Sequence, residues 1–539
     1  MDSKSSGKAA QRLPYSIESY SIDALRRIFS EEASVPLSTI QTKPHLGYFE
    51  GYFEFIKAKS ILIERDYIDR DYLEDFASYY VRCFHQYPHV CSRLHFFNEV
   101  ISVEDFEAAL KGADHKKLSD SYLGFIVVKP LPQTIIGRTC LKTYPDDNGR
   151  RHYPSTRNYE ANVFGLKLVA EHTLAFQEQD QVAAACATSA LWSAFQGTGK
   201  LFQHPIPSPV AITRAATKTW PRETRTFPNN GLDMIEMSHA IRDVGLEPLM
   251  LRADRHDILK SNLYAYLKAK IPLLMTADLY DAAVKLPLMH LQKPSYRGKH
   301  AVAATGYSLG LSAPTPYGKT GLLLKASRID KFYAHDDQVG PFARMQFTEM
   351  EMRFGDGTVL KRDFLNTSWR DPITGVGSIV ARPENLLIPL YHKIRIPFDT
   401  ISQVIVDIDQ LLEQLRTGGM APLSQRLEWD IYLTTVSEFK TDIRASSDLD
   451  DAERVGILVQ PLPKFLWCAV GYTNGQRVIG LIFDATDIEQ GSFFLRGIRY
   501  SIPLATVLQK IGQNAPQDST VIPRQTLAIL HHFAAAPDI

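Results

Sequence analysis

The chain has little cysteine, no excess of charge of either sign and no long hydrophobic run. Its five cysteines are scattered and odd in number, which argues against a disulfide framework and favours a reducing compartment. Sixty basic and sixty acidic residues cancel, so no overall field attracts nucleic acid or an anionic membrane. No run approaches the roughly 18 apolar residues of a membrane span, and the polar first residues do not form a secretory signal. Composition therefore predicts a cytoplasmic protein that binds neither nucleic acid nor membrane.

Patterns for bound metals and nucleotides are also missing. The sequence contains no G-x-x-x-x-G-K-[ST] loop and no G-x-G-x-x-G after a predicted strand. Cys83, His85, His89, Cys91 and His95 are zinc-ligand types, but their spacing fits no standard zinc finger. We therefore expect neither a metal nor an organic cofactor.

The length of 539 residues exceeds what a single core accommodates, so we expect several domains. Residues 1–165 form a predicted N-terminal α/β region whose first twelve residues are a disordered tail. Residues 166–395 form an α+β domain, with a proline-rich excursion at 202–230. Residues 396–539 form a C-terminal α/β region. The predicted class of the whole chain is α+β.

Hydrophobic spacing predicts individual elements within these regions. A helix is predicted over residues 66–88, where Pro88 stops it, and a buried strand lies in 122–132. The other predicted elements are a helix followed by a strand in 231–251 and again in 263–278, strands at 298–309 and 329–337, an amphipathic helix at 399–419, and strands within 455–472 and 477–487.

A lone cysteine stands at the start of a further predicted helix, in the stretch QEQDQVAAACATSALWSAFQ of residues 177–196. Small and apolar residues follow Cys186 at helical spacing, and Gly197 is placed to end the helix. The first turn of a helix presents unpaired N–H groups and the positive end of the helix dipole. That setting stabilises a thiolate, which is the nucleophilic form of cysteine.

A thiolate that attacks a carbonyl needs donors for the developing oxyanion and an imidazole that carries the proton. The Cys186 amide and the side-chain amide of Gln181 are candidate donors, and His300 opens a predicted strand where it can face the end of a helix. Two adjacent acids, Asp336 and Asp337, end the following predicted strand and are candidates to orient the imidazole. Because Asp336 shares strand parity with the apolar residues before it, we favour Asp336, with Asp337 as the alternative.

This order of residues resembles the papain-like cysteine peptidases, and most closely the C39-like (bacteriocin-processing, double-glycine) peptidase branch. In that family a glutamine precedes the nucleophilic cysteine by five residues, and a histidine and an aspartate follow on successive strands. The resemblance covers about residues 175–345 and implies that Gln181 donates to the oxyanion and Cys186 is the nucleophile. It further implies that His300 is the general base and acid and that Asp336 orients the imidazole.

The resemblance implies a helix bearing the cysteine, packed on an antiparallel sheet that bears the histidine and the aspartate. It also implies a cysteine peptidase that hydrolyses a peptide or isopeptide bond of a protein substrate through a thiol acyl-enzyme. Ala187 and Thr188 follow the cysteine where the family usually has Gly-Pro or Gly-Ser, and no transporter segment accompanies the domain. Two alternatives remain: an amidase or transglutaminase-like acyl transferase that uses the same residues, and an inactive papain-like fold that serves as a protein-binding scaffold.

Overall fold

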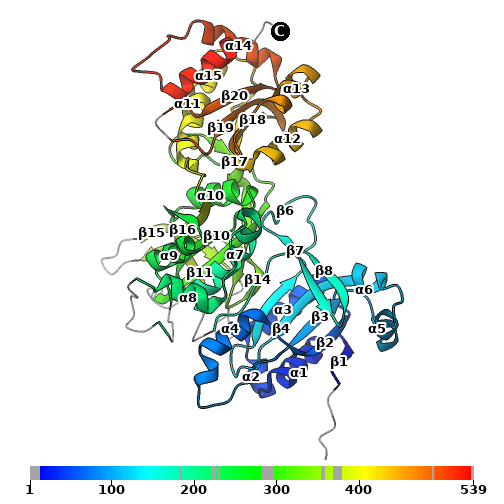
Figure 1. Cartoon of the computed structure of the whole chain (residues 1–539). Coiled ribbons are helices and arrows are strands. Elements are labelled where there is room, and N and C mark those ends of the chain that lie inside the picture. Colours follow the sequence, from blue (N-terminus) through cyan, green and yellow to red (C-terminus); the bar gives the residue numbers. More distant parts are fainter. Residues whose placement is uncertain are drawn as a thin grey trace, which may run out of the picture.

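The computed structural model describes residues 13–180, 185–219, 226–227, 231–281, 296–353, 359–367, 379–488 and 491–535. The predicted disordered tail lies outside the described residues, and so does Gln181. The described part of the chain is mixed α/β with predominantly antiparallel sheets, and Figure 1 shows three units that follow one another along the sequence. None of its helices combines the length and hydrophobicity that crossing a lipid bilayer requires.

The N-terminal unit is an antiparallel sheet of five strands in sequence order, covered by helices (Figure 1). The predicted buried strand is confirmed, because every residue of Tyr122–Val128 is buried. The predicted helix over 66–88 is wrong in extent: residues 66–67 end a strand, and Asp69 caps a helix that stops at Ser78. The elements are β1 (Tyr15–Ser19), α1 (Ile22–Ala33), α2 (Leu37–Gln41), α3 (Pro44–Ile56), β2 (Ser60–Tyr67), α4 (Arg70–Ser78), η1 (Tyr80–Arg82), β3 (Cys91–Phe97), α5 (Val103–Leu110), α6 (Lys116–Ser121), β4 (Tyr122–Val128) and β5 (Ile136–Leu141).

The middle unit is built around an antiparallel sheet that closes on itself. Its strands pair in the order β10-β11-β13-β14-β15-β16, and β16 pairs back with β10. In addition, β9 pairs with β16, and β6 pairs with β11. The elements are β6 (Arg151–His152), α7 (Cys186–Phe202), α8 (Pro209–Ala216), α9 (Met234–Asp243), β9 (Leu246–Arg252), α10 (His256–Lys268), β10 (Leu273–Asp281), β11 (Tyr296–Leu309), η2 (Lys325–Arg328), β13 (Ile329–Asp336), β14 (Gly340–Arg353), β15 (Val359–Asn366) and β16 (Ile379–Tyr391). The strands β7 (Arg157–Val163) and β8 (Leu166–Thr173) form a separate hairpin, and β8 contacts β4, β5 and α6 of the N-terminal unit (Figure 1).

Helix α8 lies inside the stretch that the sequence predicts to be a proline-rich loop. Ser208 caps α8 with its side chain, and Pro209 occupies the first turn, where a missing N–H and a fixed φ favour a helix start. Prolines at this position therefore mark a helix start, and the loop prediction for residues 202–230 is wrong over α8. Residues 220–225 and 228–230 of the same stretch lie outside the described residues.

The C-terminal unit has a second five-stranded sheet, in which β12 from the middle of the sequence pairs parallel with β17. The predicted strand region 455–472 is wrong at its start, because Asp450 caps a helix that runs to Val459 and β18 begins only at Phe465. The elements are β12 (Leu323–Leu324), α11 (Phe398–Thr417), β17 (Glu428–Thr435), α12 (Val436–Ala445), α13 (Asp451–Val459), β18 (Phe465–Thr473), β19 (Gln476–Asp484), β20 (Phe494–Arg499), α14 (Ile502–Gln513) and α15 (Arg524–Ala534).

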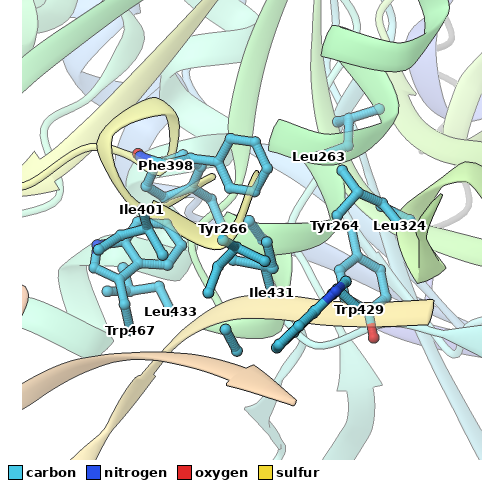
Figure 2. Close-up of a cluster of buried hydrophobic side chains, with 14 of the residues drawn as sticks. Leu263, Tyr264, Tyr266, Leu324, Phe398, Ile401, Trp429, Ile431, Leu433 and Trp467 are labelled. Atoms are coloured by element: carbon cyan, nitrogen blue, oxygen red, sulfur yellow. The ribbon is translucent and has the colours of Figure 1, made fainter. Parts of the chain in front are cut away.

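One hydrophobic core joins the middle and C-terminal units. Figure 2 shows Tyr266 of α10 and Phe398 of α11 on the side of the cluster where Trp467 of β18 lies, and Trp429 of β17 on the opposite side. All four side chains are almost completely buried, and the indole N–H of Trp467 donates to the carbonyl oxygen of Ile396 at 2.8 Å. The predicted boundary at residue 396 falls just before α11, but the core continues across it.

Candidate active site

Cys186 is the first residue of α7, as predicted from the small-residue pattern. The N-cap residue is Ala185, whose methyl side chain cannot accept a hydrogen bond from the first-turn N–H groups. Those groups and the helix dipole therefore favour a negative charge at this end of α7. Cys186 is half-buried, and α7 packs against β11, β10 and β13 of the middle sheet.

The prediction that Gly197 ends this helix is wrong. Helix α7 continues to Phe202, and a Cβ atom on Gly197 would lie 2.8 Å from Cγ of Pro272. A Cβ atom on Gly199 would likewise lie 2.6 Å from Cγ1 of Ile206. Both glycines sit in the helix because neighbouring segments approach it closely.

His300 of β11 and Asp336 at the end of β13 form a buried pair. The His300 Nε2 and Asp336 Oδ1 atoms are 2.9 Å apart, and the two side chains are 1% and 0% exposed. The backbone N–H of Gln338 donates to the same Asp336 oxygen at 3.0 Å. The carboxylate is thus fixed by its own turn and presents one oxygen to the imidazole.

The surroundings of His300 keep its imidazole protonated. Burial lowers the pKa of His300, but the charge and hydrogen bond of Asp336, the neighbouring Cys186 side chain and the charge of Asp337 together raise that pKa well above 6.5. The imidazole therefore hydrogen-bonds to the carboxylate, lies near the thiol and carries a proton near neutral pH. This is the arrangement that a cysteine nucleophile needs for its activation.

Asp337 lies near the pair without a hydrogen bond to the imidazole. Its Oδ1 is 3.9 Å from His300 Nε2, and neither of its buried carboxyl oxygens bonds to another described residue. Burial raises the pKa of Asp337 to about 7, the positive charge of His300 lowers it, and the charge of Asp336 raises it. Of the two predicted candidates, the structure thus brings Asp336 into hydrogen-bond contact with His300.

The same three side chains are also of the types that bind divalent metals. His300, Asp336 and Asp337 each place one ligand atom within 4.8 Å of the others, and the cysteine–histidine cluster of residues 83–95 forms no such group within the described residues. However, the Nε2 atom that a metal would take is hydrogen-bonded to Asp336. The observed geometry is therefore that of an acid–base pair, and a metal would have to displace its central hydrogen bond.

The other cysteines lack this environment. Cys91, Cys140 and Cys468 are buried, and burial raises the pKa of each thiol, to about 12 for Cys140. Cys83 is half-buried and contacts the carbonyl oxygen of its own helical turn. All five cysteines lie within the described residues and carry free thiols, so Cys186 differs from the rest by its helix start and its histidine.

The N-terminal unit holds the segment that leads to Cys186. Lys43, at the start of α3, is 2.5 Å from Glu178, and the backbone N–H of Ile136 donates to the second oxygen of Glu178 at 3.1 Å. The Tyr80 hydroxyl bonds to Asp180, which directly precedes Gln181. These contacts join residues up to 135 positions apart, and no local sequence pattern marks them.

The N-terminal unit also hydrogen-bonds to the turn that follows Asp336. His45 Nε2 donates to the backbone oxygen of Asp337 at 2.7 Å, and the Tyr48 hydroxyl donates to that of Pro341 at 2.5 Å. A cavity of about 830 Å³ lies beside these two hydrogen bonds. Its wall contains residues of α2 and α3, residues 178–179, the turn 337–339, and Arg344 of β14.

Three of the four predicted site residues, Cys186, His300 and Asp336, come together in the structure, whereas Gln181 lies outside the described residues. No family model and no curated protein sequence matches this chain. Inference about function therefore depends on the chemistry of this group and on the order of its residues.

Proposed function

We propose that this protein is a papain-like cysteine peptidase that hydrolyses a peptide or isopeptide bond of a protein substrate. The observation that carries the proposal is the buried imidazole of His300, which hydrogen-bonds to Asp336 and lies near enough to the thiol at the start of α7 for that thiol to raise its pKa. A nucleophile, a base in contact with it and a group that orients the base are the three parts of a covalent hydrolase.

In the proposed reaction, the Cys186 sulfur attacks the scissile carbonyl and forms a carbon–sulfur bond. His300 then gives its proton to the departing amine as the carbon–nitrogen bond breaks, which leaves a thioester. His300 next takes a proton from a water molecule whose oxygen attacks the thioester carbonyl, and the carbon–sulfur bond breaks. The Cys186 amide and Gln181 are the proposed oxyanion donors, and neither a metal nor an organic cofactor takes part.

The proposal of a protein substrate is supported by the large units on either side of the site. The N-terminal unit contacts both the segment before Cys186 and the turn after Asp336. A substrate that spans more than a few residues would reach this unit. The free thiols of the five cysteines fit the expected cytoplasmic location.

Acylation of Cys186 tests the proposal directly. Incubation with p-nitrophenyl acetate should release a burst of nitrophenol equal to the enzyme concentration and leave an acetyl group on the Cys186 peptide in mass spectrometry. The burst should disappear in Cys186→Ala and persist in Cys83→Ala, the matched control with a half-buried thiol. Peptide-library digestion then identifies the cleaved bond.

The alternatives give different results in the same experiments. Incorporation of a primary amine into the acyl group, in preference to water, would indicate a transglutaminase-like transferase. Turnover of simple amides without cleavage of peptides would indicate an amidase. If neither a burst nor an acyl adduct forms, and Cys186 labels with iodoacetamide at the same rate with and without His300, the fold is a scaffold and the proposal is refuted.

A further inference from the structure

Glutamine side chains from four separate segments line the cavity beside the turn that follows β13. They are Gln41 at the end of α2, Gln133 between β4 and β5, Gln179 before α7 and Gln338 in the turn. Three of these side chains are exposed and that of Gln179 is partly exposed, so all of them are accessible to a ligand. None of the four side-chain amides forms a hydrogen bond within the described residues. The cavity therefore presents free amide donors and acceptors from several segments.

A glutamine side chain matches the polar groups of a peptide backbone. Its oxygen accepts from a peptide N–H, and its NH₂ group donates to a peptide carbonyl oxygen. Backbone groups are free for such bonds in an extended segment, because folded proteins satisfy most of theirs internally. The amide-lined cavity is therefore suited to an extended polypeptide.

Exposed charges in this wall are compensated within the wall. Arg26 Nη2 is 3.7 Å from Glu50 Oε2, and Lys43 Nζ is 2.5 Å from Glu178 Oε1. Both carboxyl oxygens of Asp337 are buried and do not face the cavity. A charged ligand would lose hydration here without gaining a counter-ion, so the wall favours an uncharged ligand.

The remaining cation of the wall is covered by aromatic rings. The guanidinium of Arg344 lies 4.2 Å from the ring centre of Tyr144 and 4.6 Å from that of Phe55, and its Nε and Nη2 atoms are buried. Phe55 itself is 45% exposed. The exposed part of its ring adds an apolar contact surface to the amide-lined wall.

A second cavity, of about 360 Å³, adjoins the first, because Gln133 lines both. Its wall contains no Asp, Glu, Lys or Arg side chain. The ring centres of His85 and Tyr87 in this wall are 4.7 Å apart, and four prolines, at positions 36, 88, 130 and 132, complete it. Apolar walls that contain aromatic rings are typical of grooves that bind extended, proline-containing segments.

We infer that the two cavities bind one extended, uncharged segment of polypeptide. The glutamine amides bond to its backbone in the first cavity, and a proline or aliphatic side chain occupies the second cavity beside Tyr87. Most of both walls belongs to the N-terminal unit, outside the stretch 175–345 that carries the peptidase resemblance. Because Gln338 lies two residues after Asp336, the bound segment lies beside the candidate active site. Its identification as part of the substrate rests on the proposed function, whereas the binding itself does not.

Calorimetric titration of the full-length Cys186→Ala protein measures this binding without turnover. The probes are the uncharged peptide acetyl-SGAPLPAGS-amide, its charged counterparts acetyl-SGADDDAGS-amide and acetyl-SGAKKKAGS-amide, and maltoheptaose. The uncharged peptide should bind at least tenfold more tightly than either charged one. Gln133→Ala and His85→Ala, at exposed side chains, should each weaken its binding at least threefold, because each removes a contact with the segment. Gln346→Ala, at an exposed glutamine outside both walls, should leave binding unchanged.

Three results would overturn the inference: no binding of the uncharged peptide, equal binding of the charged peptides, or binding that Gln133→Ala and His85→Ala leave intact. Maltoheptaose that binds more tightly than the peptide would overturn the choice of polypeptide over carbohydrate. Circular dichroism establishes that each variant is folded. The acylation of Cys186 is a separate measurement. Peptide binding without a nitrophenol burst would refute the proposed function alone, and a burst without peptide binding would overturn this inference alone.

Discussion

Replacing one of two adjacent aspartates with asparagine should separate their roles sharply. Asp336 Oδ1 is 2.9 Å from His300 Nε2, whereas Asp337 Oδ1 is 3.9 Å away and forms no hydrogen bond to it. A hydrogen bond to a charged group contributes about 1.5–3 kcal/mol, which corresponds to a factor of about 10–150 in an equilibrium. Asp336→Asn should therefore reduce the population of the imidazolium–thiolate pair by about that factor, and Asp337→Asn by less than threefold.

The assay is the rate of iodoacetamide labelling of Cys186 between pH 5 and 9, resolved by peptide mass spectrometry. A thiol with the reference pKa of about 8.5 loses roughly 75-fold in thiolate content between pH 8 and pH 6. The pKa of His300 is raised well above 6.5, so we expect its imidazolium to make Cys186 label faster at pH 6 than Cys83, which provides the internal comparison in the same molecule. At pH 6, Asp336→Asn and His300→Ala should each slow Cys186 labelling by at least tenfold and leave Cys83 unaffected.

Equal effects of Asp336→Asn and Asp337→Asn would show that charge alone matters and that the hydrogen bond does not. Labelling of Cys186 that parallels Cys83 at every pH, in the wild type and in His300→Ala, would refute the activated pair altogether. Circular dichroism of each variant excludes unfolding as the cause of a change in rate.

Three further predictions concern stability. Burial lowers the pKa of His335 to about 3, so its neutral ring contributes to the stability of the fold above pH 6.5, and this stabilisation is lost as the pH falls. Urea unfolding should therefore show about 3 kcal/mol less stability from this group at pH 4 than at pH 7. His335→Asn should remove that pH dependence, and an unchanged slope would refute the assignment. Gly340 has φ +151° and a Cβ there would lie 2.4 Å from Tyr48, so Gly340→Ala should lower the free energy of unfolding by about 2–4 kcal/mol. The control Gly149→Ala, at φ +74° in open space, should lower it by about 1 kcal/mol. Equal losses of stability in the two variants would contradict the clash with Tyr48. Trp467→Ala should lower the free energy of unfolding by about 3–5 kcal/mol and lower the midpoint temperature of a single calorimetric transition shared by the middle and C-terminal units. Val459→Ala, at a side chain that is 73% exposed, should change stability by less than about 0.5 kcal/mol. Independent melting of the C-terminal unit would contradict a shared core.

The sequence predicted elements best where a hydrophobic period is long and its ends carry local signals. The strand Tyr122–Val128 and the helix Phe398–Thr417 follow from their apolar spacing alone. Errors occurred where a capping residue set the boundary: Asp69 starts α4 late, and Asp450 begins a helix where apolar residues suggested a strand. Side-chain caps override hydrophobic spacing over a turn or two because they satisfy the first N–H groups of a helix.

The choice between Asp336 and Asp337 shows a limit of strand parity. Parity favoured Asp336, but the pairing of β13 with β14 has a register shift between Ala334 and Asp336, and alternation is not maintained through such a shift. What orients Asp336 is the N–H of Gln338 in the turn and the position of β11. Both depend on how the strands pair, which the local sequence does not specify.

The sequence by itself placed a thiol at the start of a helix, a histidine on one strand and two acids at the end of the next, because these are local properties of the chain. Only the tertiary structure decided that the imidazole bonds to Asp336 across 36 residues and lies near the thiol of Cys186. The tertiary structure also brought His45 to the turn of Asp337 across 292 residues, and left Arg344 without an acidic partner among the described residues. Such contacts arise from the packing of whole units, in which the burial of distant apolar surfaces fixes where each polar side chain lies.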